Sequence, residues 1–396
     1  MATPQTPPRG SRPFFPDVAE GLVWPLILRA PRLALRPARL GMSLLFVVLL
    51  GLALRIPNLW TDSAKGIANS LAVKLPKVAD QFVGAVKDAS VLKLVDALRA
   101  LFAVLPRELW NEQRWYSVLA VVVPAVVLWS LLGGAVARSA AEDSVGGERK
   151  SWTAYLGFAI ERRYALPMTY LGPLGLVVIA GVLVSAVGLL LAVPFVQIVA
   201  AAGSVLGLLV SLMATLLLLG VCLSSPMLAP AVVCEGTDAI DANQRALAYV
   251  FGRPLRYFAY LALFVAVMVV CTQVVGYVVE RSLDMAVSLM TAWVGDSSRG
   301  YLHYTMLQGE APLSAGDASW SLKATGGVLA FVAGFWKLLV PAYAFSLFHS
   351  GGAMLYLVSR FANDGQEPGE LWKGSTVPEV LRKAGIDASK AAPDEL

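Results

Sequence analysis

The chain of 396 residues is 57% apolar and only 15% charged, with a formal net charge of +5. Soluble globular proteins contain about 25% charged residues, so this composition excludes an ordinary soluble domain and favours a membrane protein. The lysines and arginines lie mostly beside apolar blocks, where membrane topology explains them, and nucleic-acid binding is therefore not expected.

The first part of the chain is rich in proline and arginine. Residues 1–39 contain no apolar run long enough for a secretory signal, so no signal peptide is expected. We interpret this segment as a cytosolic N-terminal tail. Its last arginines are expected to hold the inner end of the first membrane helix, and they are Arg29, Arg32, Arg36 and Arg39.

Six membrane spans are predicted from the apolar blocks. The clearest evidence is the stretch of 71 residues between Arg163 and Glu235, which contains no Asp, Glu, Lys or Arg. As helix it would measure about 106 Å against a hydrocarbon core of about 30 Å, so we expect a hairpin that crosses the membrane twice. The spans are placed at residues 40–57, 116–137, 171–193, 198–222, 258–279 and within 326–358. Tilt or a break at Pro341 would absorb the excess length of the last block.

Two connections, 57–115 and 280–325, are predicted to be extracytoplasmic helical loops. In the first, apolar residues recur at the spacing of one helix face. A weaker version of the pattern covers residues 281–294. We expect amphipathic helices that pack on the bundle or lie in the membrane interface, with lids or partner platforms as the alternative. The apolar face of the first loop consists of Val91, Leu94, Val95, Leu98, Leu101, Phe102 and Leu105.

Two more amphipathic helices are expected on the cytosolic side. One covers residues 151–163. The other is capped by Thr237 or Asp238 and ends at Gly252 and Pro254. The arginines of this second region suit anionic lipid headgroups or a cytosolic partner, and topology alone also explains them; they are Arg245, Arg253 and Arg256.

Lysine and arginine counts predict the orientation of the spans. With the N-terminus in the cytosol, the cytosolic segments hold 19 of these residues and the extracytoplasmic segments hold 11. Positively charged residues are enriched on the cytosolic side of membrane proteins. Both termini are therefore predicted to be cytosolic, with a C-terminal tail over residues 359–396.

Three segments resemble recurrent parts of a family of uncharacterised multi-pass membrane proteins of planctomycete-type bacteria. They are residues 133–138 (GGAVAR), 244–254 (QRALAYVFGRP) and 354–360 (MLYLVSR) followed by Asp364-Gly365. The resemblance covers most of residues 130–366 and implies a bacterial cytoplasmic membrane protein without implying an activity. Glu235-Gly236 and the helix after it are also similar to bacterial glycerophosphodiester-phosphodiesterase-like membrane domains, without their phosphodiesterase residues. The motif residues are Arg138, Glu235, Gly236, Arg245, Gly252, Arg253, Pro254 and Arg360.

No catalytic, cofactor-binding or metal-binding residues are predicted. The chain has two histidines, His303 and His349, so neither an HExxH motif nor a multi-histidine metal centre is available. His349 is the best candidate functional residue, because an ionisable group inside a span is a functional hypothesis by default. No span offers a carboxylate for a triad, so we interpret His349 as neutral and hydrogen-bonded to a serine or a carbonyl of a neighbouring helix.

Polar residues within the spans leave two functions open. Thr272 and Gln273, with Ser204, Ser211, Thr215 and His349, could line a path for a small or lipid-like substrate, or could form hydrogen bonds between helices. Glycine pairs at 203/207 and 351/352 permit close helix approach. The favoured function is a non-enzymatic scaffold or accessory subunit that contacts membrane lipids or an unidentified protein partner. The alternative is a transporter or permease subunit.

Overall fold

In the computed structural model the described part of the protein is all-α, as the predicted membrane-spanning and amphipathic helices imply. The structure describes residues 24–60, 67–88, 90–100, 104, 107–108, 115–147, 150–308 and 319–372. The helices in chain order are α2 (Leu26–Ala34), α3 (Pro37–Ala53), η1 (Ile56–Leu59), α4 (Ile67–Lys87), α5 (Val91–Arg99), α7 (Trp115–Ser144), α8 (Trp152–Glu161), α9 (Ala165–Leu191), α10 (Val196–Glu235), α11 (Ala239–Gly252), α12 (Pro254–Met290), α13 (Asp296–Gln308), α14 (Trp320–Lys337) and α15 (Leu339–Asp364).

Within these residues, six helical segments are long and apolar enough to cross a membrane. They are Pro37–Leu59, Tyr116–Ser144, Ala165–Leu191, Val196–Glu235, Pro254–Met290 and Trp320–Asp364. The prediction of six spans is confirmed, and the chain is a multi-pass membrane protein. Several spans are longer than predicted: α10 has 40 residues, or about 60 Å of helix, twice the hydrocarbon thickness.

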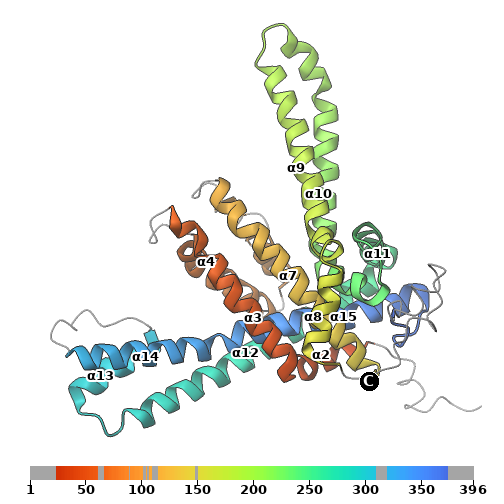
Figure 1. Ribbon diagram of the computed structural model, residues 1–396. Coiled ribbons are helices and arrows are strands. Elements are labelled where there is room, and N and C mark those ends of the chain that lie inside the picture. The colour runs from red at the N-terminus through yellow and green to blue at the C-terminus, as the bar shows by residue number, and fades with distance from the viewer. Residues whose placement is uncertain are drawn as a thin grey trace, which may run out of the picture.

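The excess length is explained by a common packing region from which the helices spread apart (Figure 1). The α9/α10 hairpin extends in one direction, α12 and α14 in another, and α3, α4 and α7 lie between them. We call these extensions the arms. The packing region, which we call the hub, combines α2, α8, α11 and α15 with residues 132–141 of α7 and 220–234 of α10. Helices such as α10 therefore cross a membrane with one half and pack against protein with the other.

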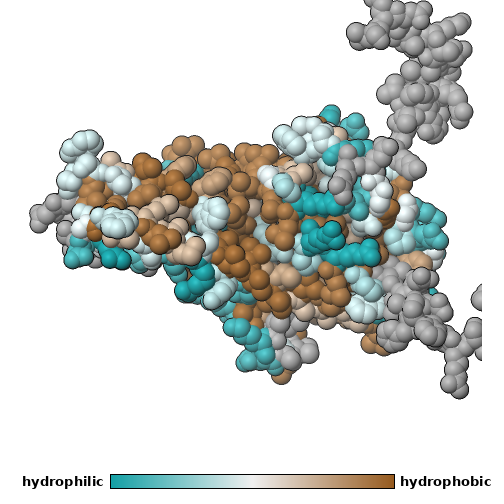
Figure 2. Space-filling view, turned by 90° about the horizontal axis from the view of Figure 1, so that it is seen from below, coloured by the Kyte–Doolittle hydropathy of each residue, from teal (hydrophilic) through white to brown (hydrophobic). Residues whose placement is uncertain are grey.

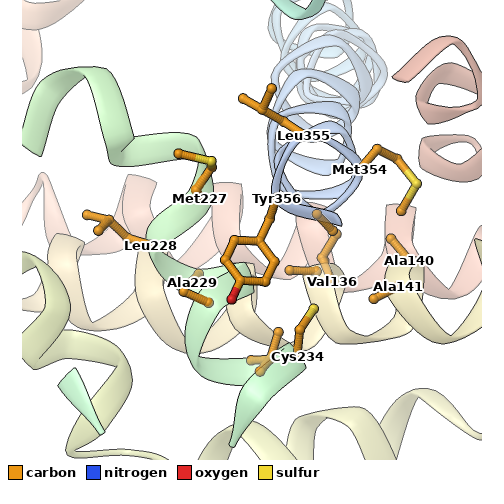
Figure 3. Close-up of a cluster of buried hydrophobic side chains, with 14 of the residues drawn as sticks. Val136, Ala140, Ala141, Met227, Leu228, Ala229, Cys234, Met354, Leu355 and Tyr356 are labelled. Carbon is orange, nitrogen blue, oxygen red and sulfur yellow. The ribbon is translucent and has the colours of Figure 1, made fainter. Parts of the chain in front are cut away.

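Small side chains allow the hub helices to pack closely. Figure 3 shows side chains of α7, α10 and α15 meeting in one buried cluster, among them Val136, Ala140, Ala141, Met227, Leu228, Ala229, Met354 and Tyr356. The closest approach involves Gly352 of α15, where an added Cβ would lie 2.2 Å from the carbonyl oxygen of Pro226. Gly351 similarly makes room for the ring of Phe264. The glycine pair 351/352 thus permits close helix approach, as the sequence predicts.

The arms present apolar side chains to the outside. In α9, none of the most apolar window is buried within the protein. Figure 2 shows hydrophobic residues over much of the face seen from below, with hydrophilic residues along its edges and in a patch in its right-hand half. In a membrane, lipid tails can cover such surfaces without a cost in free energy, since the tails are as apolar as the side chains.

Ser204 and Thr215, for which the sequence leaves a polar path or hydrogen bonds between helices open, form hydrogen bonds within their own helix. Ser204 donates to the carbonyl of Ala201 at 2.7 Å, and Thr215 donates to that of Ser211 at 2.8 Å, both within α10. A serine or threonine in a helix reaches the carbonyls of the preceding turn without help from a neighbour. Gly203 also has nothing within 4 Å of an added Cβ, so its small size is not used for packing within the protein.

Three predicted boundaries differ from the structure. Residues up to Met290 continue α12 rather than forming a separate helix over 281–294, because no glycine or proline lies between Gly276 and Met290. The long last block is interrupted at Leu338 rather than at Pro341, since a proline disturbs the helix over the preceding turn. The end of the predicted N-terminal tail forms helix α2, whose apolar face packs on α15.

The bounds of the two helices expected on the cytosolic side were predicted closely. Ser151 caps α8, and Asp238 caps α11 by accepting a hydrogen bond from the backbone N–H of Asp241 at 2.9 Å. Helix α11 ends at Gly252, and Pro254 begins α12, where a missing N–H has no cost. Of the amphipathic helix predicted in the first extracytoplasmic loop, Val91–Arg99 is helical as α5, and Leu101, Phe102 and Leu105 lie outside the described residues.

Candidate functional site: a buried charge cluster in the hub

The end of α10 places a carboxylate among three helices of the hub. Glu235 Oε1 accepts hydrogen bonds from the Tyr356 hydroxyl and from Arg360 Nη1 of α15, both at 2.9 Å. Its Oε2 accepts one from Arg245 Nη1 of α11 at 3.1 Å. The Arg360 side chain is only 1% exposed, so Glu235 is the counter-charge that makes its burial tolerable.

A second ion pair lies on α7 beside this carboxylate. Arg138 Nε donates to Glu142 Oε1 at 2.7 Å, one helical turn along the same helix. The remaining guanidinium nitrogens of Arg138 donate to the carbonyl oxygens of Val233 and Trp372, each at 2.7 Å. Arg138 therefore connects α7 both to α10 and to the segment that follows α15.

That segment, residues 365–372, is folded back onto the hub, and we call it the strap. It begins where Gly365 ends α15 in the left-handed conformation, with φ of 71°. Arg360 Nη2 donates to the carbonyl of Glu367 at 2.9 Å, and the backbone N–H of Trp372 donates to the carbonyl of Cys234 at 2.8 Å. The strap thus supplies a donor to one of the carbonyls that the end of α10 leaves without a helical partner.

The Trp372 ring fits a space that only a glycine leaves open. A Cβ on Gly236 would lie 2.4 Å from this ring, and Gly236 also adopts a φ of 69°, which favours glycine. The guanidinium of Arg162 lies 4.7 Å from the centroid of the indole, and the Phe158 ring lies 5.8 Å away, so α8 completes the space.

Tyr249 and Asp364 extend the cluster along α11. The Tyr249 hydroxyl donates to Asp364 Oδ2 at the end of α15. Burial of the ring, followed by this hydrogen bond and the negative charges nearby, raises the pKa of Tyr249 above its ordinary value. Tyr249 is therefore a neutral donor, and it ties α11 to the last turn of α15.

A separate charged group joins the N-terminal helices to α7. Arg39 is buried and donates to Ser139 Oγ at 3.1 Å, to the Ser139 carbonyl at 2.9 Å and to Asp143 Oδ2 at 2.9 Å. It also donates to the carbonyl of Leu33 at the end of α2. Arg39 therefore does not lie at the membrane surface as predicted, since its partners are Ser139, Asp143 and Leu33 of the protein itself.

The structure brings most of the motif residues together. Arg138, Glu235, Gly236, Arg245 and Arg360 lie within the charge cluster or against the strap. Gly252, Arg253 and Pro254 lie apart from it, at the exposed junction of α11 and α12, where a Cβ on Gly252 would come within 3.3 Å of Asn363 Oδ1. Their role is the turn between two helices.

Sequence reasoning missed several members of the cluster. Glu142 could have been found, because it follows Arg138 by four residues in a helical segment, which is the spacing of an ion pair. Tyr356 precedes Arg360 by the same interval, so both side chains lie on one face of α15. Trp372 has no such local signal, since its partners lie far away in the chain.

His349 lies in a different, aromatic environment. Its ring centroid is 4.5 Å from that of Phe345, 5.0 Å from Trp129 and 5.2 Å from Phe348. A Cβ on Gly133 would lie 2.2 Å from the imidazole, so this glycine makes room for it. In the described part of the chain neither ring nitrogen has a hydrogen-bond partner, and the predicted hydrogen bond was therefore wrong. The aromatic neighbours offer no acceptor at the ring edge.

Thr272 and Gln273 are not joined to His349. Both lie on α12, where Gln273 is exposed and Thr272 is half-buried. His349 lies on α15 and directs its ring towards Gly133 of α7. Among the described residues, no hydrogen bond links the three side chains, and no group of three His, Cys, Asp or Glu residues is placed to hold a metal ion.

A prediction for His349 follows from its missing partners. Replacing it by leucine is expected to leave the stability of the protein unchanged or to raise it by up to about 1–3 kcal/mol, which is the cost of burying an unsatisfied polar group. Replacing Ser346, three residues earlier, by alanine is expected to lower stability by about 1 kcal/mol, because its hydroxyl donates to the carbonyl of Ala34 at 2.8 Å. Thermal unfolding in detergent measures both. A His349→Leu variant less stable than Ser346→Ala would show that the imidazole has a partner.

These features define the class of the protein as a helical multi-pass membrane protein with a hub fixed by buried charges. No family model, curated protein or solved structure matches the chain.

Proposed function

We propose that the protein is a non-enzymatic scaffold or accessory subunit of the bacterial cytoplasmic membrane, with both termini in the cytosol. The observation that supports this role best is that the buried charged side chains of the hub bind partners within the protein itself. Glu235 accepts three hydrogen bonds, all from residues of the hub, and Arg138 donates to Glu142, Val233 and Trp372. These side chains hold helices together, as expected of a rigid platform.

The surface of α11 is where we propose that a partner or lipid headgroups bind. Ile240 is 68% exposed, and Phe251, near the other end of the helix, is 61% exposed. Arg253 and Arg256 are exposed at the junction with α12. Apolar side chains on α11 with basic side chains at its junction with α12 suit either anionic lipids or a partner with an acidic surface. The lysine and arginine distribution supports a cytosolic position for this helix.

Purification from the native membrane in a mild detergent, followed by mass spectrometry, tests the proposal. We expect a stoichiometric companion protein that the wild type retains and the double variant Ile240→Ser, Arg253→Gln loses. The matched control is Val328→Ser, Arg281→Gln, which removes one exposed apolar residue and one exposed arginine from the α12/α14 arm. A companion lost equally from both variants would contradict binding at α11.

The transporter alternative is favoured by one feature, the buried imidazole of His349 within a span. The same experiment separates the two functions. A protein that purifies alone, with one class of small molecule bound, would support transport and contradict the scaffold role.

A further inference from the structure

The end of the α12/α14 arm contains a pocket that is remote from the hub. Helix α13 follows the turn after α12 and lies against α14 (Figure 1). One face of α13, together with Ser288 of α12, lines a pocket of about 620 Å³. Asp296, Arg299, His303 and Tyr304 lie on this face, at the spacing of successive helical turns. The volume lies within the range of about 300–1,000 Å³ typical of small-molecule sites.

The pocket contains two opposite charges that do not pair with one another. Among the described residues, neither Asp296 nor Arg299 takes part in an ion pair or a side-chain hydrogen bond. On the same arm, Arg281 and Asp284 have the same spacing of three residues and do pair, at 3.2 Å. The two pocket charges are therefore available to a ligand that itself carries a positive and a negative group.

The surroundings of the pocket are those of a membrane interface. Met285 and Leu289, one helical turn apart on α12, are both exposed, and Trp293 in the turn after this helix is 95% exposed. Exposed tryptophans are typical of the boundary between lipid tails and headgroups, and exposed apolar side chains on a spanning helix face lipid tails. Charged residues therefore lie next to an apolar helix surface.

We propose that this pocket binds the headgroup of a zwitterionic phospholipid that carries a primary amine, with its acyl chains along α12. Arg299 and His303 donate hydrogen bonds to the phosphate, as cationic or N–H-bearing side chains do at phosphate sites. Asp296 accepts from the ammonium group. An anionic headgroup without an amine fits less well, because Asp296 would repel it. The site does not depend on the role proposed for α11.

Competitive lipid binding tests this inference. The full-length protein, purified and delipidated in detergent, is mixed with equal amounts of phosphatidylethanolamine and phosphatidylglycerol of matched acyl chains, and bound lipids are counted by native mass spectrometry. The wild type is expected to prefer phosphatidylethanolamine about two- to fivefold, as expected for one exposed charge pair. Arg299→Gln is expected to weaken the binding of both lipids. Asp296→Asn is expected to abolish or reverse the preference.

Two further variants make the result specific. Asp284→Asn removes the same charge from the same arm outside the pocket and is expected to keep the wild-type preference. Asp296→Glu keeps the negative charge in the first turn of α13 and is expected to keep the preference for phosphatidylethanolamine. A loss of this preference in Asp296→Asn can then be assigned to the missing charge and not to damage to the helix. A wild type without preference, or an equal effect of Asp284→Asn and Asp296→Asn, would overturn the proposal.

Discussion

Replacing Glu235 by glutamine is expected to lower the free energy of unfolding by about 3–5 kcal/mol, the cost of breaking a buried ion pair by removing one partner. The amide keeps the shape of the side chain but removes the negative charge that faces Arg360 and Arg245. Arg360 is almost fully buried, so its positive charge would remain without compensation from Glu235. Equilibrium unfolding in detergent micelles measures the loss.

Two control variants test the cause of this loss. Glu280→Gln is the same substitution at an exposed position of α12 and is expected to change stability by less than about 0.5 kcal/mol. The double variant Glu235→Gln, Arg360→Met removes both buried charges and is expected to be more stable than Glu235→Gln alone. If the double variant were the least stable, the uncompensated charge of Arg360 would not be the cause.

The sequence predicts the spans well because hydropathy measures what a membrane requires. The charge-free stretch up to Glu235 forms the expected hairpin, α9 with α10. Hydropathy does not distinguish apolar residues that face lipid from those that face protein, because both environments are apolar. The division of α10 into an exposed half and a half buried in the hub was therefore invisible in the sequence.

The sequence predicted individual residues of the candidate site but not how they are arranged in space. Glu235, Arg245 and Arg360 were singled out by resemblance, and the structure shows that they form one cluster. The partners Val233 and Trp372 contribute backbone carbonyls, which no side-chain pattern reveals. His349 was predicted to need a polar neighbour. Its aromatic neighbours Phe345 and Phe348 lie on α15 itself, and Trp129 comes from α7, more than two hundred residues earlier in the chain.

Replacing Gly352 by alanine is expected to lower the free energy of unfolding by about 3 kcal/mol, at the upper end of the usual cost of overpacking. The new methyl group would meet the carbonyl oxygen of Pro226 at 2.2 Å and its carbonyl carbon at 3.1 Å. Both are backbone atoms within α10, so they cannot move aside as a flexible side chain would. The two helices would have to separate.

The carbonyl of Pro226 is available to Gly352 because of a second proline. In an α-helix this oxygen would accept a hydrogen bond from the N–H of residue 230, which is Pro230 and has none. The Hα of Gly352 that takes the place of a side chain points at this oxygen, an arrangement that suits a weak Cα–H···O contact. The two prolines and the glycine together explain why α10 and α15 approach so closely.

Unfolding of Gly352→Ala beside Gly203→Ala tests this account of the hub. Gly203 also lies in α10, but an added Cβ there has nothing within 4 Å, so alanine is expected to stabilise the helix by about 0.5–1 kcal/mol. If the two substitutions change the free energy of unfolding in opposite directions, contact between helices, rather than helix propensity, determines the effect of each substitution. If Gly352→Ala were as stable as Gly203→Ala, α10 and α15 could not be in backbone contact at this position.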